Sequence, residues 1–187
     1  MNYYILLDGV FFKAIYYDVF IEYMVSNMIG EGLKEFLEDY SKLVILGIGN
    51  DIRGDDGLGQ YIVNELDKKI DNVSIEIINA KTVPENFTGK IRSIDPSHIL
   101  IIDAVIMDEK PGTIRLVKKE EVSSVSISTH SMSLSYLVKY LELEKPYDIL
   151  FIGVQPENMD LGETSLTKSC KNSSDEVISV LEEILVN

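Results

Sequence analysis

Residues 43–59 read LVILGIGNDIRGDDGLG and decide the fold of the chain. Residues 43–48 form the continuous apolar run expected of a strand that is buried on both faces, as in a parallel sheet. Two glycines then allow a sharp turn, and the charged residues that follow would not be tolerated in a core. Beyond this loop, apolar residues recur at the spacing of an amphipathic helix. The stretch therefore predicts a buried strand, a polar loop and a helix, with Asp55 and Asp56 near the helix start.

The rest of the chain alternates apolar, β-branched runs with amphipathic segments. The expected strands lie at residues 43–48, 73–78, 98–102, 113–117 and 148–154. The expected helices lie at residues 32–40, after residue 57, from 82 to 94, from 131 to 143 and at the C-terminal end. Strands separated by helices indicate βαβ units, whose right-handed crossovers join parallel strands. We therefore predict an α/β three-layer sandwich, with a mostly parallel twisted sheet of about five strands flanked by helices.

Two of the expected helices carry more detailed predictions. Thr82 is expected to cap the helix that follows it, with Glu85 three residues later as its capping-box partner. The helix at residues 131–143 is expected to place one set of side chains on the same side: Met132, Tyr136, Leu137 and Tyr140.

Length and composition favour a single domain. At 187 residues and 45% hydrophobic, the chain can bury a sizeable core. We expect an N-terminal extension at residues 1–40 and the folded domain at residues 41–187. An alternative left open is a native start at Met28, which would place residues 1–27 outside the native protein, or at Met24.

Charge and cysteine content narrow the partners and the compartment. With 17 Lys and Arg against 31 Asp and Glu, the net charge of −14 disfavours nucleic acid and anionic membranes and favours a cationic or metal-bearing partner. A single cysteine excludes an internal disulfide and indicates a reducing, cytoplasmic environment. No apolar run reaches the length of about 18 residues that a membrane span needs.

The glycine-rich loop does not fit a dinucleotide site. It begins as the dinucleotide fingerprint does, but Ile52 stands where the third glycine is required. No acidic residue closes the second strand, where a ribose ligand is expected. The aspartates of the loop would also place negative charge where a pyrophosphate must bind. The loop is therefore better suited to binding a cation than to binding a dinucleotide.

Three polar residues are expected to meet at the carboxyl edge of the sheet. Asp56, Asp103 and His130 would supply two hard oxygen ligands and one imidazole, a set suited to a divalent first-row metal. Each residue also has a simpler role open to it: Asp56 near a helix dipole, Asp103 bonding loop N–H groups, and His130 capping a helix. Because ligands bind at this edge in open α/β sheets, their joint placement favours a site.

Six motifs occur in a specific order and spacing. They are Gly47-Ile-Gly-Asn50, Gly54-Asp-Asp-Gly57, Pro84-Glu-Asn86, Ile101-Ile-Asp103-Ala, Thr129-His130-Ser-Met132 and Gly153-Val-Gln-Pro156. The ordered set resembles the hydrogenase maturation proteases, which trim the C-terminal extension of the nickel-iron hydrogenase large subunit. The likeness covers residues 42 to about 186 and is closest to the branch that serves formate-hydrogenlyase-type enzymes.

The resemblance implies an endopeptidase that acts on a precursor already loaded with nickel. Its metal-contacting positions fall on Asp56, Asp103 and His130, which would engage nickel held by the precursor. No tightly bound cofactor of the protease itself is then expected. Many relatives carry an aspartate where this chain has Asn79, so this chain lacks that carboxylate.

The resemblance leaves two mechanisms open for cleavage of the peptide bond. Either a carboxylate among Asp55, Asp56 and Asp103 acts as general base on water, or the engaged nickel polarises the scissile carbonyl, which we favour. The residues expected to bind the substrate are Gly54, Asn50 and Glu85.

A receiver-type signalling domain is the alternative from another class. Such domains are α/β sheets with an acidic pair after the first strand and an aspartate, here Asp103, that binds magnesium and accepts phosphate. Against it, Asp55 and Asp56 come several residues past the strand, and no lysine follows the last strand before Lys168. A catalytically inactive scaffold for hydrogenase assembly is a third hypothesis.

Overall fold

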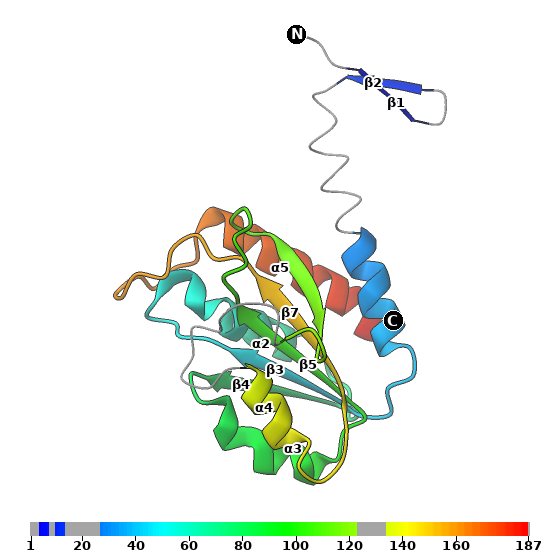
Figure 1. Ribbon diagram of the computed structural model, residues 1–187, viewed down its shortest axis with the longest axis vertical. Helices are drawn as coiled ribbons and strands as arrows, with labels where there is room; N and C mark the ends of the chain where they lie inside the picture. Colours follow the sequence, from blue (N-terminus) through cyan, green and yellow to red (C-terminus); the bar gives the residue numbers. More distant parts are fainter. Residues whose placement is uncertain (1–3, 8–9, 14–26, 123–133, 187) are drawn as a thin grey trace.

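The computed structural model describes residues 4–7, 10–13, 27–122 and 134–186 (Figure 1). Within these residues, β1 (Tyr4–Leu7) and β2 (Val10–Lys13) form one antiparallel pair. The strands of the main sheet are β3 (Leu43–Ile48), β4 (Ile75–Lys81), β5 (His98–Ala104), β6 (Ile114–Lys118) and β7 (Asp148–Val154). The helical elements are residues 27–37, η1 (Gly54–Gly57), α2 (Leu58–Asp67), η2 (Pro84–Phe87), α3 (Thr88–Ile94), α4 (Leu134–Leu141) and α5 (Lys168–Val186).

The main sheet has the strand order β4-β3-β5-β7-β6. Neighbouring strands pair in parallel except β6, which runs antiparallel to β7 at one edge. The chain passes from β3 to β4 and then returns beyond β3 to β5, so the strand order reverses between β3 and β5. The crevice outside the carboxyl ends of the strands at such a point is the usual ligand site of open α/β sheets.

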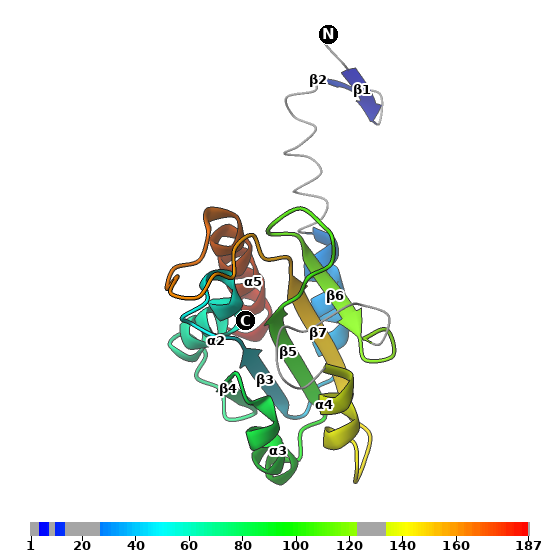
Figure 2. The same cartoon turned by 60° about the vertical axis from the view of Figure 1, so that its left-hand side comes forward.

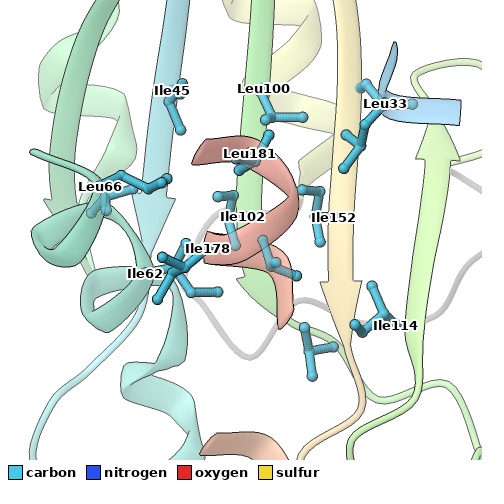
Figure 3. Close-up of a cluster of buried hydrophobic side chains, with 14 of the residues drawn as sticks. Leu33, Ile45, Ile62, Leu66, Leu100, Ile102, Ile114, Ile152, Ile178 and Leu181 are labelled. Atoms are coloured by element: carbon cyan, nitrogen blue, oxygen red, sulfur yellow. The ribbon is translucent and has the colours of Figure 1, made fainter. Parts of the chain in front are cut away.

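Helices cover both faces of this sheet (Figures 1 and 2). The helix at residues 27–37, α2 and α5 pack on one face, where Figure 3 shows Leu181 of α5 beside Ile45, Leu100 and Ile152 of the sheet. The other face packs against α3 and α4 in a second core. The predicted α/β three-layer sandwich with a mostly parallel sheet is therefore confirmed.

The first helix adds a segment to the core that was expected to lie outside it. Ile29, Leu33 and Leu37 are buried in the α2–α5 core. The boundary at residue 41 remains a prediction, but the core draws on residues from the helix before it. None of the helices in the described ranges is long and apolar enough to cross a membrane.

Two detailed predictions about helices were wrong. Thr82 caps no helix: the next helical turn is η2, which begins at Pro84 after Val83 and has no side-chain cap. Tyr136 and Tyr140 of α4 are 66% and 45% exposed, whereas Leu137 is buried. The buried face of α4 consists of Leu134, Leu137, Val138 and Leu141, and Met132 lies outside the described residues.

Gly59 lets the start of α2 approach the sheet closely. A Cβ at this position would lie 2.2 Å from the carbonyl oxygen of Ile48 and 2.5 Å from that of Ile102. These are backbone atoms of β3 and β5, so neither can move aside without shifting a central strand. The absence of a side chain at Gly59 therefore fixes how η1 and α2 sit over the two strand ends.

We expect Gly59→Ala to lower the free energy of unfolding by about 2–3 kcal/mol because of this overlap. Urea denaturation measures the change. Gly89→Ala is the matched control, since Gly89 lies in α3 and a Cβ there meets nothing within 4 Å. Alanine is expected to stabilise that position by about 0.5–1 kcal/mol. Equal effects of the two changes would contradict the packing argument.

Candidate active site

The loop between β3 and α2 closes on itself at the carboxyl edge of the sheet. The backbone N–H of Asn50 donates to the carbonyl oxygen of Asp56 at 2.9 Å, and that of Arg53 donates to Asn50 at 3.0 Å. Gly49 has a φ of +153°, and a Cβ there would lie 2.1 Å from the carbonyl oxygen of Asp56. Only glycine fits such a position. The closed loop therefore holds Asp55 and Asp56 on η1, which contacts β5.

Asp56 and Asp103 are buried carboxylates at this edge. Their exposed fractions are 4% and 1%. Asp103 directly follows Ile102, which pairs with Gly47 on β3. Ile101 packs in the α3–α4 core and Ile102 in the α2–α5 core, so side-chain alternation places Asp103 on the α3–α4 side. Carboxylate oxygens are ordinary ligands of divalent cations, so a cationic ligand is compatible with the two residues at this edge.

Asp55 joins η1 to the loop that follows β7. Its Oδ2 accepts hydrogen bonds from the backbone N–H groups of Glu157 and Asn158, both at 2.9 Å, and from the Thr167 hydroxyl at 3.0 Å. Its Oδ1 accepts the backbone N–H of Thr167 at 2.7 Å. In return, the backbone N–H of Asp55 donates to the carbonyl oxygen of Asn158 at 2.9 Å. The carboxylate therefore fastens two loops together at the edge of the site.

These contacts decide the protonation state of Asp55. Burial alone would raise the pKa of this carboxyl group, but the hydrogen bonds from Asn158, Thr167 and Glu157 together lower it below its ordinary value. Asp55 is thus ionised at neutral pH, and four hydrogen bonds occupy its oxygens. Such a group is suited to holding loops in place.

Two of the residues expected to bind substrate lie in the loop around η1. Asn50 accepts the backbone N–H of Ile52 through its side-chain oxygen at 3.3 Å. Gly54 has a φ of +55°, and a Cβ there would lie 2.7 Å from the carbonyl oxygen of Asn158. Gly54 also lines a groove of about 440 Å³ that runs between η1, α2 and the segment before α5. The loop thus borders a concave surface on the α2 side of this edge.

The structure leaves the metal-contacting set incomplete. His130 lies outside the described residues, shortly before α4. Within the residues that are described, no three His, Cys, Asp or Glu side chains gather closely enough to hold a metal ion. Asn79 is on the α2 side of the sheet, where its amide donates to the Asn64 side chain at 3.0 Å. It therefore has a structural contact on the face opposite to Asp103.

Thr167, just before α5, and Cys170, within α5, differ in what they can contribute to this edge. The sequence did not indicate a role for Thr167, yet its backbone N–H and its hydroxyl donate hydrogen bonds to the two carboxylate oxygens of Asp55. Cys170 is fully buried, and burial raises the pKa of its thiol to about 11. A thiol in that state is not an activated nucleophile, so a cysteine-protease mechanism has no group to use in the described part of the chain.

Comparison with known proteins shows to which family the chain belongs. A family model described as hydrogenase maturation protease matches residues 60–184. A Methanocaldococcus jannaschii protein named for the same activity is 38% identical over 162 residues, which are 83% of this chain and 95% of the relative. The chain belongs to the hydrogenase maturation protease family. The resemblance drawn from the six motifs is therefore confirmed.

Solved structures of family members share the fold. The [NiFe] hydrogenase maturation protease HycI of Thermococcus kodakarensis superimposes with a TM-score of 0.76 at 28% identity, covering 83% of this chain and 99% of that protein. The endopeptidase HycI of Escherichia coli gives a TM-score of 0.67 at 30% identity, covering 76% and 90%. The chain is thus a protease of hydrogenase maturation.

The receiver-type alternative is not supported. Counted from β3 as the first strand, the main sheet has the order 2-1-3-5-4 with its fourth strand antiparallel. Receiver-type sheets have the order 2-1-3-4-5. Both the topology and the family match therefore point away from a phosphate-accepting role for Asp103 in this maturation protease.

Proposed function

We propose that this protease removes the C-terminal extension of a nickel-loaded [NiFe] hydrogenase large-subunit precursor. The observation that carries the proposal is the pair of buried carboxylates, Asp56 and Asp103, at the point where strand order reverses. Two anionic groups there suit a substrate that brings its own cation. The names of relatives from two organisms connect this family to hydrogenase maturation.

In this proposal Asp56, Asp103 and His130 contact the nickel of the precursor. The topology is consistent with His130 joining the aspartates: α4 packs on the same face of the sheet as Asp103. Carboxylate oxygens and an imidazole are ordinary ligands of a divalent first-row metal. The nickel belongs to the substrate, and it marks a precursor that is ready to be cut.

Two routes lead from this arrangement to peptide hydrolysis. Bound nickel can polarise the scissile carbonyl as a Lewis acid, or Asp56 or Asp103 can take a proton from the attacking water. Asp55 was predicted as a third catalytic carboxylate, but its oxygens are engaged by Glu157, Asn158 and Thr167. We therefore assign Asp55 to positioning of the loops, and the reacting groups to the other two aspartates.

Substrate contacts are assigned to the rim of the same edge. Asn50 and Gly54 belong to the closed loop, and Gly54 borders the groove between η1 and α2. Glu85 lies across the sheet edge on η2. We further propose that the domain spans residues 41–187 with an N-terminal extension at 1–40, and that the protein works in the cytoplasm with its precursor.

We expect the full-length protein to trim a large-subunit precursor only after nickel has been inserted. The assay incubates the protein with precursor prepared with and without nickel and determines the mass of the product. The expected result is a shortened product from the nickel-loaded precursor alone. Equal trimming of both precursors would remove nickel from the recognition step, and trimming of neither would leave the inactive-scaffold hypothesis in its place.

A further inference from the structure

Glu85 carries a buried oxygen that the rest of the described chain does not satisfy. Its Oε2 atom is excluded from solvent and has no hydrogen-bond partner there. A buried acceptor left in this state destabilises a fold, because it has lost its hydrogen bonds to water without replacement. Native proteins contain few such atoms, and each calls for a physical explanation.

The position of Glu85 connects it to the edge that holds the aspartates. It lies on η2, four residues after β4 ends at Lys81. Phe87, two residues further on, packs against the α3–α4 core. Asp103 lies on this same face at the carboxyl end of β5. Glu85 and Asp103 thus share one face and one edge of the sheet, with β3 between their strands.

Among the residues that the structure describes, no contact of the side chain supports a structural role for it. The capping bond expected with Thr82 is not formed, since η2 starts at Pro84 without a side-chain cap. The hydrogen bond that Glu85 does make uses its backbone: the Thr88 hydroxyl donates to its carbonyl oxygen at 2.8 Å. The residue as a whole is half-buried, so part of it is exposed at this edge, while Oε2 itself is covered and has to be uncovered by a molecule that docks there.

We propose that Glu85 binds the precursor, with Oε2 accepting a hydrogen bond from an N–H donor of the peptide near the scissile bond. The inference rests on the proposed function and adds a specific contact to it. The donor is a backbone amide or a cationic side chain of the precursor; a carboxylate accepts from both. The free protein keeps an unsatisfied acceptor that docking of the precursor satisfies.

Stability and activity should then respond in opposite directions. We expect Glu85→Leu to raise the Tm by about 2–6 °C, because it removes a buried acceptor without a partner. The same change is expected to raise the KM for nickel-loaded precursor by about 10- to 100-fold with a smaller change in kcat, because it removes a binding contact. Gains in stability with loss of function are typical of substitutions at functional sites.

Glu85→Gln separates the two kinds of donor. Glutamine keeps an acceptor oxygen and loses the charge. Near-normal KM in this variant identifies a backbone amide as the donor, and a KM close to that of Glu85→Leu identifies a cationic side chain. Either result supports the inference when Glu85→Leu is impaired.

Glu142→Leu is the matched control, because the Glu142 carboxylate is satisfied. It accepts from the Lys119 ammonium at 2.7 Å and from the backbone N–H of Tyr147 at 3.0 Å. This change is expected to lower the Tm and leave KM unchanged. A lower Tm or an unchanged KM for Glu85→Leu, measured beside an active wild type, would overturn the role of Glu85. An inactive wild type would instead count against the proposed function.

Discussion

Asp103→Asn is expected to reduce trimming of nickel-loaded precursor by at least about 100-fold, the range that loss of a group acting on the reacting atoms produces. Asparagine keeps the size of the side chain and removes the negative charge. With Asp103 1% exposed at the end of β5, that charge acts in a site of low dielectric, where its attraction for a cation is strong. The product is quantified by mass spectrometry under single-turnover conditions, so that binding and cleavage can be separated.

Asp148→Asn provides the comparison for this variant. Asp148 begins β7 at the amino edge of the sheet, where it pairs with His98 on β5, and it is exposed. The substitution is thus of the same type, on a neighbouring strand, at the end away from the proposed site. Trimming is expected at the wild-type rate. Wild-type activity in Asp103→Asn, with Tm and circular dichroism unchanged, would exclude Asp103 from the reaction.

The central strands and the edge that they form could be predicted because the sequence signals there are local. An uninterrupted apolar run such as residues 43–48 fits a strand covered on both faces, and the structure buries all of it. The polar loop and the helix after it were predicted from the same stretch, residues 43–59. Asp103 was predicted to lie at the carboxyl edge because it ends another apolar run. Short-range periodicity therefore carried most of the architecture.

The features that could not be predicted depend on contacts between segments that lie far apart in the sequence. Asp55 resembles an ordinary acid near a helix start, and its fixing role depends on donors more than 100 residues away, at Glu157, Asn158 and Thr167. Similarly, the pattern of residues 131–143 allowed several helix faces, and packing on α3 and the sheet selected one that leaves Tyr136 exposed. The predicted capping box at Thr82 is not formed, because the helical turn η2 begins at Pro84 instead.

Asp55→Asn should produce the largest loss of stability among the site variants. The ionised carboxylate accepts three backbone N–H groups and the Thr167 hydroxyl. An asparagine amide would replace one acceptor oxygen by a donor, which would face donors and leave them unsatisfied. We expect a loss of about 3 kcal/mol at pH 7, hence a Tm lower by about 6–12 °C. Asp51→Asn, an exposed change in the same loop, is expected to stay within about 0.5 kcal/mol of wild type.

The pH dependence of the stability lost in Asp55→Asn shows whether the charge or the shape of the Asp55 side chain stabilises the protein. Because the folded state lowers the pKa of Asp55, its ionisation adds stability at pH values above the ordinary carboxyl pKa of 3.8. That stability is lost as the pH falls through the lowered pKa of the folded state. Urea denaturation of both proteins from pH 7 downwards should therefore show the difference between wild type and Asp55→Asn shrinking below about pH 4. A difference that stays constant down to the lowest pH at which both proteins fold would mean that side-chain shape, and not the charge, holds the two loops together.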